Sequence, residues 1–93
     1  MDLTQCREEI NKIDDQMKAL FLRRMEVVSE VAKYKIENNM PIFDANREAS
    51  MKERLSSDTG DMKDYYLAFL EEMLVQSKNY QKKLIEDAKW NKK

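Results

Sequence analysis

Apolar residues follow a regular spacing along the first third of the chain. They recur at alternating intervals of three and four, at Leu3, Cys6, Ile10, Ile13, Met17, Leu20, Val27, Val31 and Tyr34. This spacing is typical of the packed seam of a long helix. Asp2 with Gln5 forms a candidate capping box at its start, and Asn38, Asn39 and Pro41 end it. The pattern therefore predicts one helix from about residue 2 to about residue 38.

Two further helices follow from the cap and turn residues. After a loop over residues 39–43, Asp44 is expected to cap a second helix through about Ser57. Residues 57–60 break that helix, and Asp61 is expected to cap a third, which runs to about residue 90. Its apolar stripe consists of Tyr66, Leu70, Met73, Leu84 and Ala88. We therefore expect an all-α fold, a single domain over residues 1–93 with one very long, one short and one long helix.

The first helix is too long for a compact monomer. About 36 residues rising ~1.5 Å each make a rod of ~54 Å. A compact chain of this length has a radius of gyration near ~12 Å and a diameter of only ~30 Å. The far half of the seam would then lack cover from its own chain, and exposed apolar stripes of this size favour association. We expect an intertwined helical homodimer with two-fold symmetry.

Composition fits this picture and excludes several classes of function. Gly and Pro occur once each, and 38% of the residues are charged. The formal net charge of −1 does not favour nucleic-acid binding. No apolar run approaches the ~20 residues that span a bilayer, and no signal-peptide core is visible, so we expect a cytoplasmic protein. A cluster near the end is interpreted as the solvated face of the last helix: Lys78, Lys82, Lys83, Lys89, Lys92 and Lys93.

Polar residues interrupt the apolar pattern on each helix. Arg24 occupies a seam position whose nine other members are all non-polar, and Lys35 lies three turns later on nearly the same face. On the third helix Ser77 and Gln81 interrupt the stripe between Met73 and Leu84. The second helix opens with three polar residues on one face, Asp44, Arg47 and Glu48.

Each break also has an ordinary structural explanation. Arg24 alone could be a buried ion-pair partner, the pair on the third helix could be a polar layer, and Asp44 could be a simple cap. Breaks on all three helices together favour a shared polar pocket inside the bundle. Arg7 lies 17 residues before Arg24, which is ~25 Å along the rod, so it could reach the pocket only from a partner chain. An exposed surface cation is the other interpretation of Arg7.

A pocket lined by Arg7, Arg24, Lys35 and Arg47 would select an anion with more than one carboxylate, since an Arg side chain binds a carboxylate with two hydrogen bonds. The chain has no His, and it offers no Ser–His or Cys–His pair, no metal constellation and no Gly-rich phosphate loop. We expect no cofactor and no metal. Any catalysis would then depend on positioning and on hydrogen bonds to developing charge.

The ordered set of these residues resembles the all-helical (type II) chorismate mutases. The resemblance begins at Arg7 in CREEINKIDDQM and continues through Arg24 and Lys35 in LRRMEVVSEVAKYK. It then includes Pro41, the DANRE block and finally Ser77 and Gln81 in QSKNYQKK. It covers nearly the whole chain. The connection around residues 58–61 is short for the family, which affects the pairing of the last two residues with their family equivalents.

The resemblance implies a Claisen rearrangement of chorismate to prephenate, an isomerase reaction that commits carbon toward phenylalanine and tyrosine. It implies that Arg24, with Arg7 from the partner chain, holds the substrate carboxylates with help from Ser77. Lys35 and Gln81 would donate to the ether oxygen. Glu48 would bind the ring hydroxyl, and that wall would be completed by Asp44 and Arg47. No dehydratase, dehydrogenase or synthase segment is evident in these residues, so we expect a monofunctional enzyme.

Two alternatives remain open at this stage. An isochorismate pyruvate lyase uses the same fold and a similar cationic pocket, although the set of Asp44, Arg47 and Glu48 favours the mutase. A non-catalytic helical module would use the seam to bind other helices. It predicts that Arg24→Ala and Lys35→Ala leave function intact, whereas Ile13→Asp destroys it.

Overall fold

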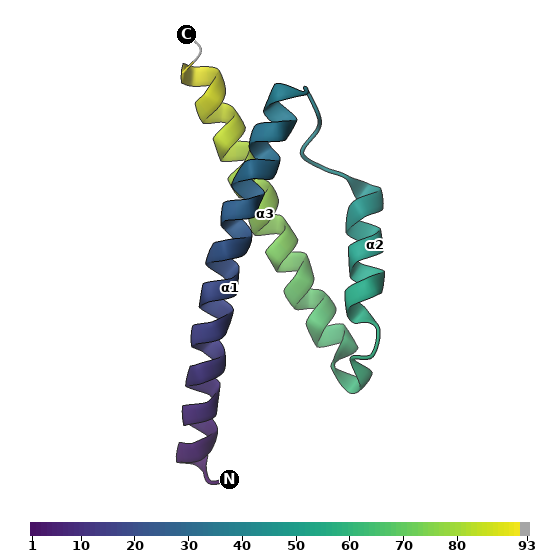
Figure 1. The fold of residues 1–93 in the computed structure, drawn as a ribbon. Helices are drawn as coiled ribbons and strands as arrows, with labels where there is room; N and C mark the ends of the chain where they lie inside the picture. The colour runs from purple at the N-terminus through teal and green to yellow at the C-terminus, as the bar shows by residue number, and fades with distance from the viewer. Residues whose placement is uncertain (92–93) are drawn as a thin grey trace.

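Three α-helices and one short 3₁₀ turn make up the chain in a computed structural model that describes residues 1–91. The elements are α1 (Leu3–Glu37), α2 (Ala45–Ser56), η1 (Gly60–Met62) and α3 (Lys63–Asn91). Figure 1 shows α1 and α3 crossing as two long rods, with α2 standing beside α3. The predicted all-α class is confirmed, with no strand among the described residues. Within this range no helix is long and apolar enough to cross a membrane.

The ends of α1 are set by the residues that the sequence indicated. The backbone nitrogen of Gln5 donates to Asp2 Oδ1 at 2.8 Å, and the backbone nitrogen of Asp2 donates to Gln5 Oε1 at 2.9 Å. This reciprocal pair satisfies two amides at the helix start. At the other end Asn38 is the C-cap, and Asn39 has a positive φ of 52°, a conformation that Asn tolerates. Both predicted ends are confirmed.

The second connection differs from the prediction. Asp44 caps α2 as expected, accepting a hydrogen bond from the backbone nitrogen of Arg47 at 3.0 Å. The predicted cap at Asp61 was wrong, because this residue lies inside the 3₁₀ turn η1. The backbone nitrogen of Met62 donates to the Thr59 carbonyl at 3.0 Å, and the turn runs directly into α3. The backbone amides of Met62 and Lys63, at the start of this helical segment, therefore donate to backbone carbonyls, as the i→i+3 bonds of a 3₁₀ turn allow.

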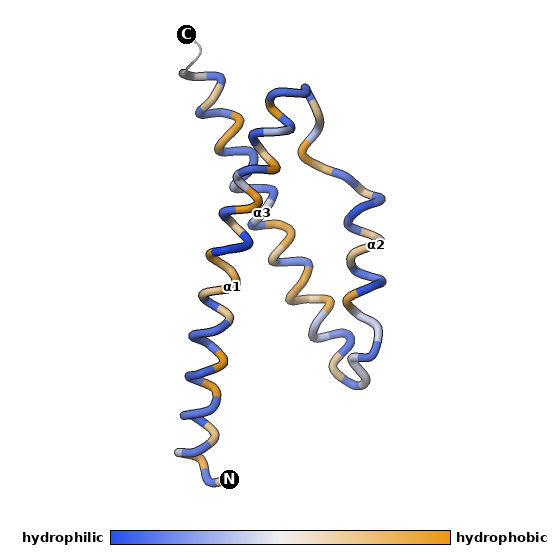
Figure 2. The backbone as a smooth tube through the Cα atoms, viewed as in Figure 1, coloured by the Kyte–Doolittle hydropathy of each residue, from blue (hydrophilic) through white to orange (hydrophobic). Residues whose placement is uncertain are grey.

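The core lies where the three helices meet. Val28 and Ala32 on α1 are buried, and Ala32 has no exposed surface. Met51 of α2 packs with Leu70 and Leu74 of α3 in the main buried cluster. Figure 2 shows hydrophobic positions recurring along α3, whereas the N-terminal half of α1 extends past the junction without a neighbouring helix in the described chain. The buried core is therefore small: it joins α2 to α3 and includes α1 only through its C-terminal half.

The predicted seam of α1 stays open in the single chain. Apart from Cys6, which is partly buried, its apolar residues are exposed along the whole helix, including the half that crosses α3, where Val27 is 52% exposed. The half of the seam nearest α3 therefore also lacks cover from its own chain. The face that α3 covers is one position further on, at Val28 and Ala32. A straight helix drifts by ~20° per heptad relative to a 3.5-residue repeat, so the face rotates along the rod.

The molecule is elongated, as the length of α1 predicted. Its radius of gyration is 17.0 Å and its longest extent is 59 Å. A compact chain of this length would have a radius of gyration near ~12 Å. The excess comes from the free half of α1 and leaves the seam accessible to a partner.

Leu70→Ala tests the importance of the small core. Leu70 is 1% exposed and is the largest fully buried side chain of the described residues. We expect the substitution to lower the free energy of unfolding by about 2–5 kcal/mol, because it leaves a cavity that neighbours fill only in part. The matched variant Leu70→Met should cost less than about 1.5 kcal/mol. Urea denaturation followed by circular dichroism measures both, and equal costs would contradict this assignment of the core.

Candidate active site

A polar cavity of about 180 Å³ lies between the three helices and the loop before α2. Its walls come from all three helices. The lining residues are Arg24, Val28, Val31, Lys35, Ile42, Asp44, Arg47, Glu48, Met51, Leu74, Ser77, Lys78 and Gln81. Seven of the eight residues predicted for the site therefore line one cavity, and their roles stay predictions at this point.

Arg24 enters the cavity from α1 and is half-buried. Its Nη1 donates to the hydroxyl of Ser77, which in turn donates to the Met73 carbonyl at 2.9 Å. Ser77 is only 4% exposed, so the guanidinium is held by a fixed acceptor. Burial lowers the pKa of Arg24 from its ordinary value, and the positive charge of Arg47 lowers it further. Two guanidinium groups that repel each other in this way favour an anion between them.

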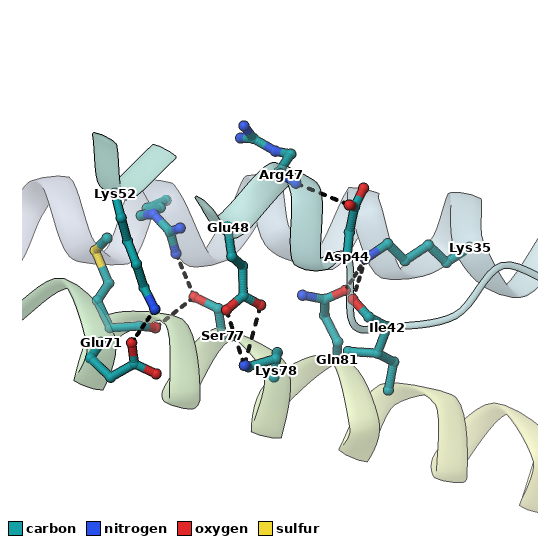
Figure 3. Close-up of polar contacts among 12 residues, drawn as sticks. Lys35, Ile42, Asp44, Arg47, Glu48, Lys52, Glu71, Ser77, Lys78 and Gln81 are labelled. Atoms are coloured by element: carbon teal, nitrogen blue, oxygen red, sulfur yellow. Dashed lines mark hydrogen bonds and ion pairs between the residues drawn. The ribbon is translucent and has the colours of Figure 1, made fainter. Parts of the chain in front are cut away.

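Lys35 also lines the cavity, and it fixes the orientation of the Gln81 amide. Its Nζ donates to the Ile42 carbonyl at 2.8 Å and to Gln81 Oε1 at 3.1 Å. An ammonium group has three donors and no acceptor, so one N–H remains for a ligand. Because Lys35 takes the amide oxygen of Gln81, the amide –NH₂ is left to donate, and Figure 3 shows it turned away from Lys35. Both side chains therefore present hydrogen-bond donors.

The α2 side of the cavity is more open. Asp44 and Arg47 are exposed, and Figure 3 shows the guanidinium of Arg47 projecting away from the Lys35–Gln81 pair. The Asp44 carboxylate caps α2, so the interpretation of this residue as a cap is confirmed, although it also lines the cavity. Glu48 is better enclosed, with 14% of its side chain exposed.

Lys78 is a lining residue that the sequence interpretation missed. It was assigned to a solvated lysine face, but its Nζ lies 3.2 Å from each carboxylate oxygen of Glu48. Lys82, Lys83 and Lys89 are exposed as expected, while Lys92 and Lys93 lie outside the described residues. The feature of the sequence that could have indicated this role is the position of Lys78, one residue after Ser77 and three before Gln81. The assignment of Lys78 to the solvated face was therefore wrong.

Arg7 is the predicted site residue that the structure does not bring to the cavity. It is exposed on the N-terminal half of α1 and is not among the lining residues. This placement agrees with the rod geometry, which separates it from Arg24 within one chain. Any contact of Arg7 with the cavity would have to come from a second copy.

The charges of the cavity suit a small dianion. The lining contains two carboxylates, Asp44 and Glu48, and four cations: Arg24, Lys35, Arg47 and Lys78. The cavity therefore has two positive charges in excess. Arg and Lys side chains are the usual partners of carboxylates in such sites. Within residues 1–91 no group of three His, Cys, Asp or Glu side chains could hold a metal ion. The arrangement can bind a small dianion, orient it and donate hydrogen bonds to it.

A second ion pair joins α2 to α3 outside the cavity. Lys52 contacts Glu71, and this hydrogen bond raises the pKa of Lys52 and lowers the pKa of Glu71. Both groups lie at the surface, where such pairs contribute little to stability. The pair nevertheless offers a direct comparison for the Lys78–Glu48 pair, which joins the same two helices inside the cavity.

Comparison with known proteins identifies the family. The family description "chorismate mutase type II" matches residues 6–82, which include most of α1 and both Ser77 and Gln81 of α3. The chain belongs to the type II chorismate mutase family. Membership confirms the resemblance drawn from the sequence, and it supports an isomerase-type enzyme. Every cavity residue described above lies within the matched range.

Curated relatives in this chorismate mutase family are longer proteins. A bifunctional chorismate mutase/prephenate dehydratase of Buchnera aphidicola subsp. Schizaphis graminum is 34% identical over 87 residues, covering 90% of this chain and 23% of that protein. The T-protein of Haemophilus influenzae is 39% identical over 49 residues, covering 53% of this chain and 13% of that protein. A bifunctional chorismate mutase/prephenate dehydratase of Escherichia coli K12 is 38% identical over 53 residues, covering 57% of this chain and 14% of that protein. The chain thus spans about a quarter or less of these relatives, and no solved structure matches it at a comparable level.

Proposed function

We propose that this chain is a chorismate mutase, which converts chorismate to prephenate in the cavity between its three helices. The observation that supports it is the gathering of Arg24, Lys35 and Gln81 with the α2 polar residues around one small cationic cavity. Chorismate and prephenate each carry two carboxylates, which match the two excess positive charges. We further propose that residues 1–93 act as a single domain in the cytoplasm.

In this proposal Arg24 holds one substrate carboxylate, and Ser77 fixes its guanidinium. The Arg24–Ser77 hydrogen bond supports the assignment, because a buried hydroxyl leaves the guanidinium with less freedom to lose on binding. Arg7 of a partner chain would hold the other carboxylate. Glu48 would accept a hydrogen bond from the ring hydroxyl, with Asp44 and Arg47 completing that wall.

Lys35 and Gln81 would provide the catalysis. In the rearrangement an ether C–O bond breaks and a C–C bond forms within the same molecule, so no outside reactant is needed. Negative charge grows on the ether oxygen as its bond to carbon lengthens. Donors that are already in place strengthen their hydrogen bonds to that charge, and this lowers the transition state relative to the bound substrate. The fixed orientation of Lys35 and Gln81 supports this role.

We propose that two copies form an intertwined homodimer through the seam of α1. An apolar groove of about 550 Å³ opens between α1 and α3, next to Arg24. Its lining includes two seam residues and the stacked pair Tyr66 and Phe69, whose ring centroids are 6.1 Å apart. Burying an exposed Leu, Ile or Phe is worth roughly 1.5–3 kcal/mol, so α1 of a second copy would gain much by covering this groove.

Incubation of the purified protein with chorismate, with identification of prephenate, tests the proposed function. Loss of chorismate absorbance with formation of prephenate is the expected result. A parallel incubation with isochorismate separates the lyase alternative, since release of pyruvate without any prephenate from chorismate would replace the mutase assignment. A protein inactive on both substrates would instead favour the helical interaction module.

Mixing two inactive variants tests whether Arg7 acts across the dimer. Arg7→Ala and Lys35→Ala should each be nearly inactive alone. After subunit exchange, half of the dimers are mixed and each mixed dimer regains one intact site. We therefore expect about one quarter of wild-type activity from an equal mixture. Native mass spectrometry confirms the exchange, and absence of recovery in exchanged dimers would contradict a role for Arg7 in the partner's site.

A further inference from the structure

Lys78 joins α3 to α2 at the wall of the cavity. Its Nζ lies 3.2 Å from both Oε1 and Oε2 of Glu48. It also lies 4.8 Å from the centroid of the Phe43 ring, at cation–π distance. Only 29% of the Lys78 side chain is exposed. The ammonium is therefore held from two sides, and Figure 3 shows Glu48 directed to it from α2.

Glu48 creates an electrostatic conflict in a site for a dianion. A carboxylate in a small, partly buried cavity repels an incoming ligand with two negative charges. The ring hydroxyl of the proposed substrate nevertheless needs an acceptor at this wall. A cation that pairs with both oxygens of Glu48 removes the repulsion and leaves further lone pairs for a hydroxyl donor. Lys78 is the cavity cation that pairs with this carboxylate.

We propose that Lys78 is a positioning residue, which acts on the substrate through Glu48. It holds the Glu48 carboxylate at the cavity wall and compensates its charge, so that the carboxylate can accept the substrate hydroxyl beside two substrate carboxylates. This inference rests on the proposed function, because it concerns the binding of chorismate in the same cavity. Lys78 does not need to touch the substrate.

The surface pair Lys52–Glu71 distinguishes this role from simple attachment of α2. It links the same two helices but lies outside the cavity. If Lys78 only attached α2 to α3, Lys52→Met and Lys78→Met would have similar effects. Lys52 senses the charge of Glu48 but forms its ion pair with Glu71. If Lys78 acts through Glu48, Lys52→Met therefore lowers turnover much less than Lys78→Met does.

A double-mutant cycle in the full chain tests the inference. We expect Lys78→Met to lower kcat/KM about 10- to 100-fold, the range for loss of a hydrogen bond to a charged group, mainly through a higher KM. Lys78→Arg keeps the charge and should recover most of that loss. In a Glu48→Gln background, where no carboxylate remains to be held, Lys78→Met should cost less than about threefold.

Three results would overturn the inference: wild-type kinetics for Lys78→Met, an equal cost of Lys78→Met in both backgrounds, or an equal loss in Lys52→Met. Wild-type protein without activity on chorismate would reject the proposed function instead. Crystal structures of the wild type and of Lys78→Met provide a readout that needs no turnover. We expect the Glu48 carboxylate to leave the cavity wall in the variant, and an unmoved carboxylate would overturn the positioning role.

Discussion

Replacement of Lys35 by Met should lower kcat by about 1,000-fold. Loss of a single preorganised donor to developing negative charge typically costs 10²- to 10³-fold in kcat. Lys35 should lie at or beyond the upper end of that range, because it also sets the orientation of the Gln81 amide and is held by the Ile42 carbonyl. One substitution would therefore weaken both donors to the ether oxygen. Met retains much of the length of the side chain, so the loss reports the ammonium group.

Stopped-flow or steady-state absorbance of chorismate measures this loss, and light scattering checks the oligomeric state. Lys33→Met is the matched control, since Lys33 is exposed two residues earlier on the same helix. It should leave kcat within about twofold of wild type, because surface changes away from a site have small effects. A wild-type kcat for Lys35→Met would remove Lys35 from the proposed mechanism.

Ile13→Asp should abolish the dimer and all measurable activity. Ile13 lies at the middle of the free half of α1 and is 50% exposed in the single chain. In the proposed dimer it would be buried, and burial of an unpaired carboxylate among apolar side chains carries a large penalty. The small core around Leu70 and Met51 would then have to hold the chain alone, at a size where single cores are marginal.

Analytical ultracentrifugation gives the decisive measurement, with wild type expected at twice the chain mass of 11.1 kDa. Asn11→Asp provides the control, because it introduces the same side chain on the opposite face of α1. Asn11→Asp should stay dimeric and active. If the wild type sediments as a stable monomer, the proposed dimer and the role of Arg7 are both rejected.

Local chemistry made most of the fold predictable. Asp2, Asp44 and Asn38 act through hydrogen bonds within four residues of their own position, so the sequence alone contains the information that places these helix ends. The Asp61 cap failed because a 3₁₀ turn offered the same amides backbone acceptors. That competition depends on how residues 57–62 close, which the residue types leave open.

The site was predictable where a polar residue stood on an apolar stripe. Arg24, Ser77 and Gln81 were visible for this reason, and all three line the cavity. Lys78 gave no such contrast, since polar residues flank it on α3, Ser77 before it and Asn79 after it. Its importance depends on the placement of α2, which brings Glu48 to it from 30 residues away. The buried face of α1 likewise depends on the crossing with α3, so the pattern located the seam and missed Val28 and Ala32.

The surplus of two positive charges in the cavity has a consequence for how the protein survives in the cell. An empty site keeps like charges together at a cost to the native state, as the effect of Arg47 on Arg24 indicates. In the proposed function a bound dicarboxylate would relieve that repulsion only in the folded chain, and ligands that bind the native state alone raise its melting temperature. Metabolite supply would then protect the enzyme from unfolding and degradation, and starvation for it would shorten the lifetime of the protein.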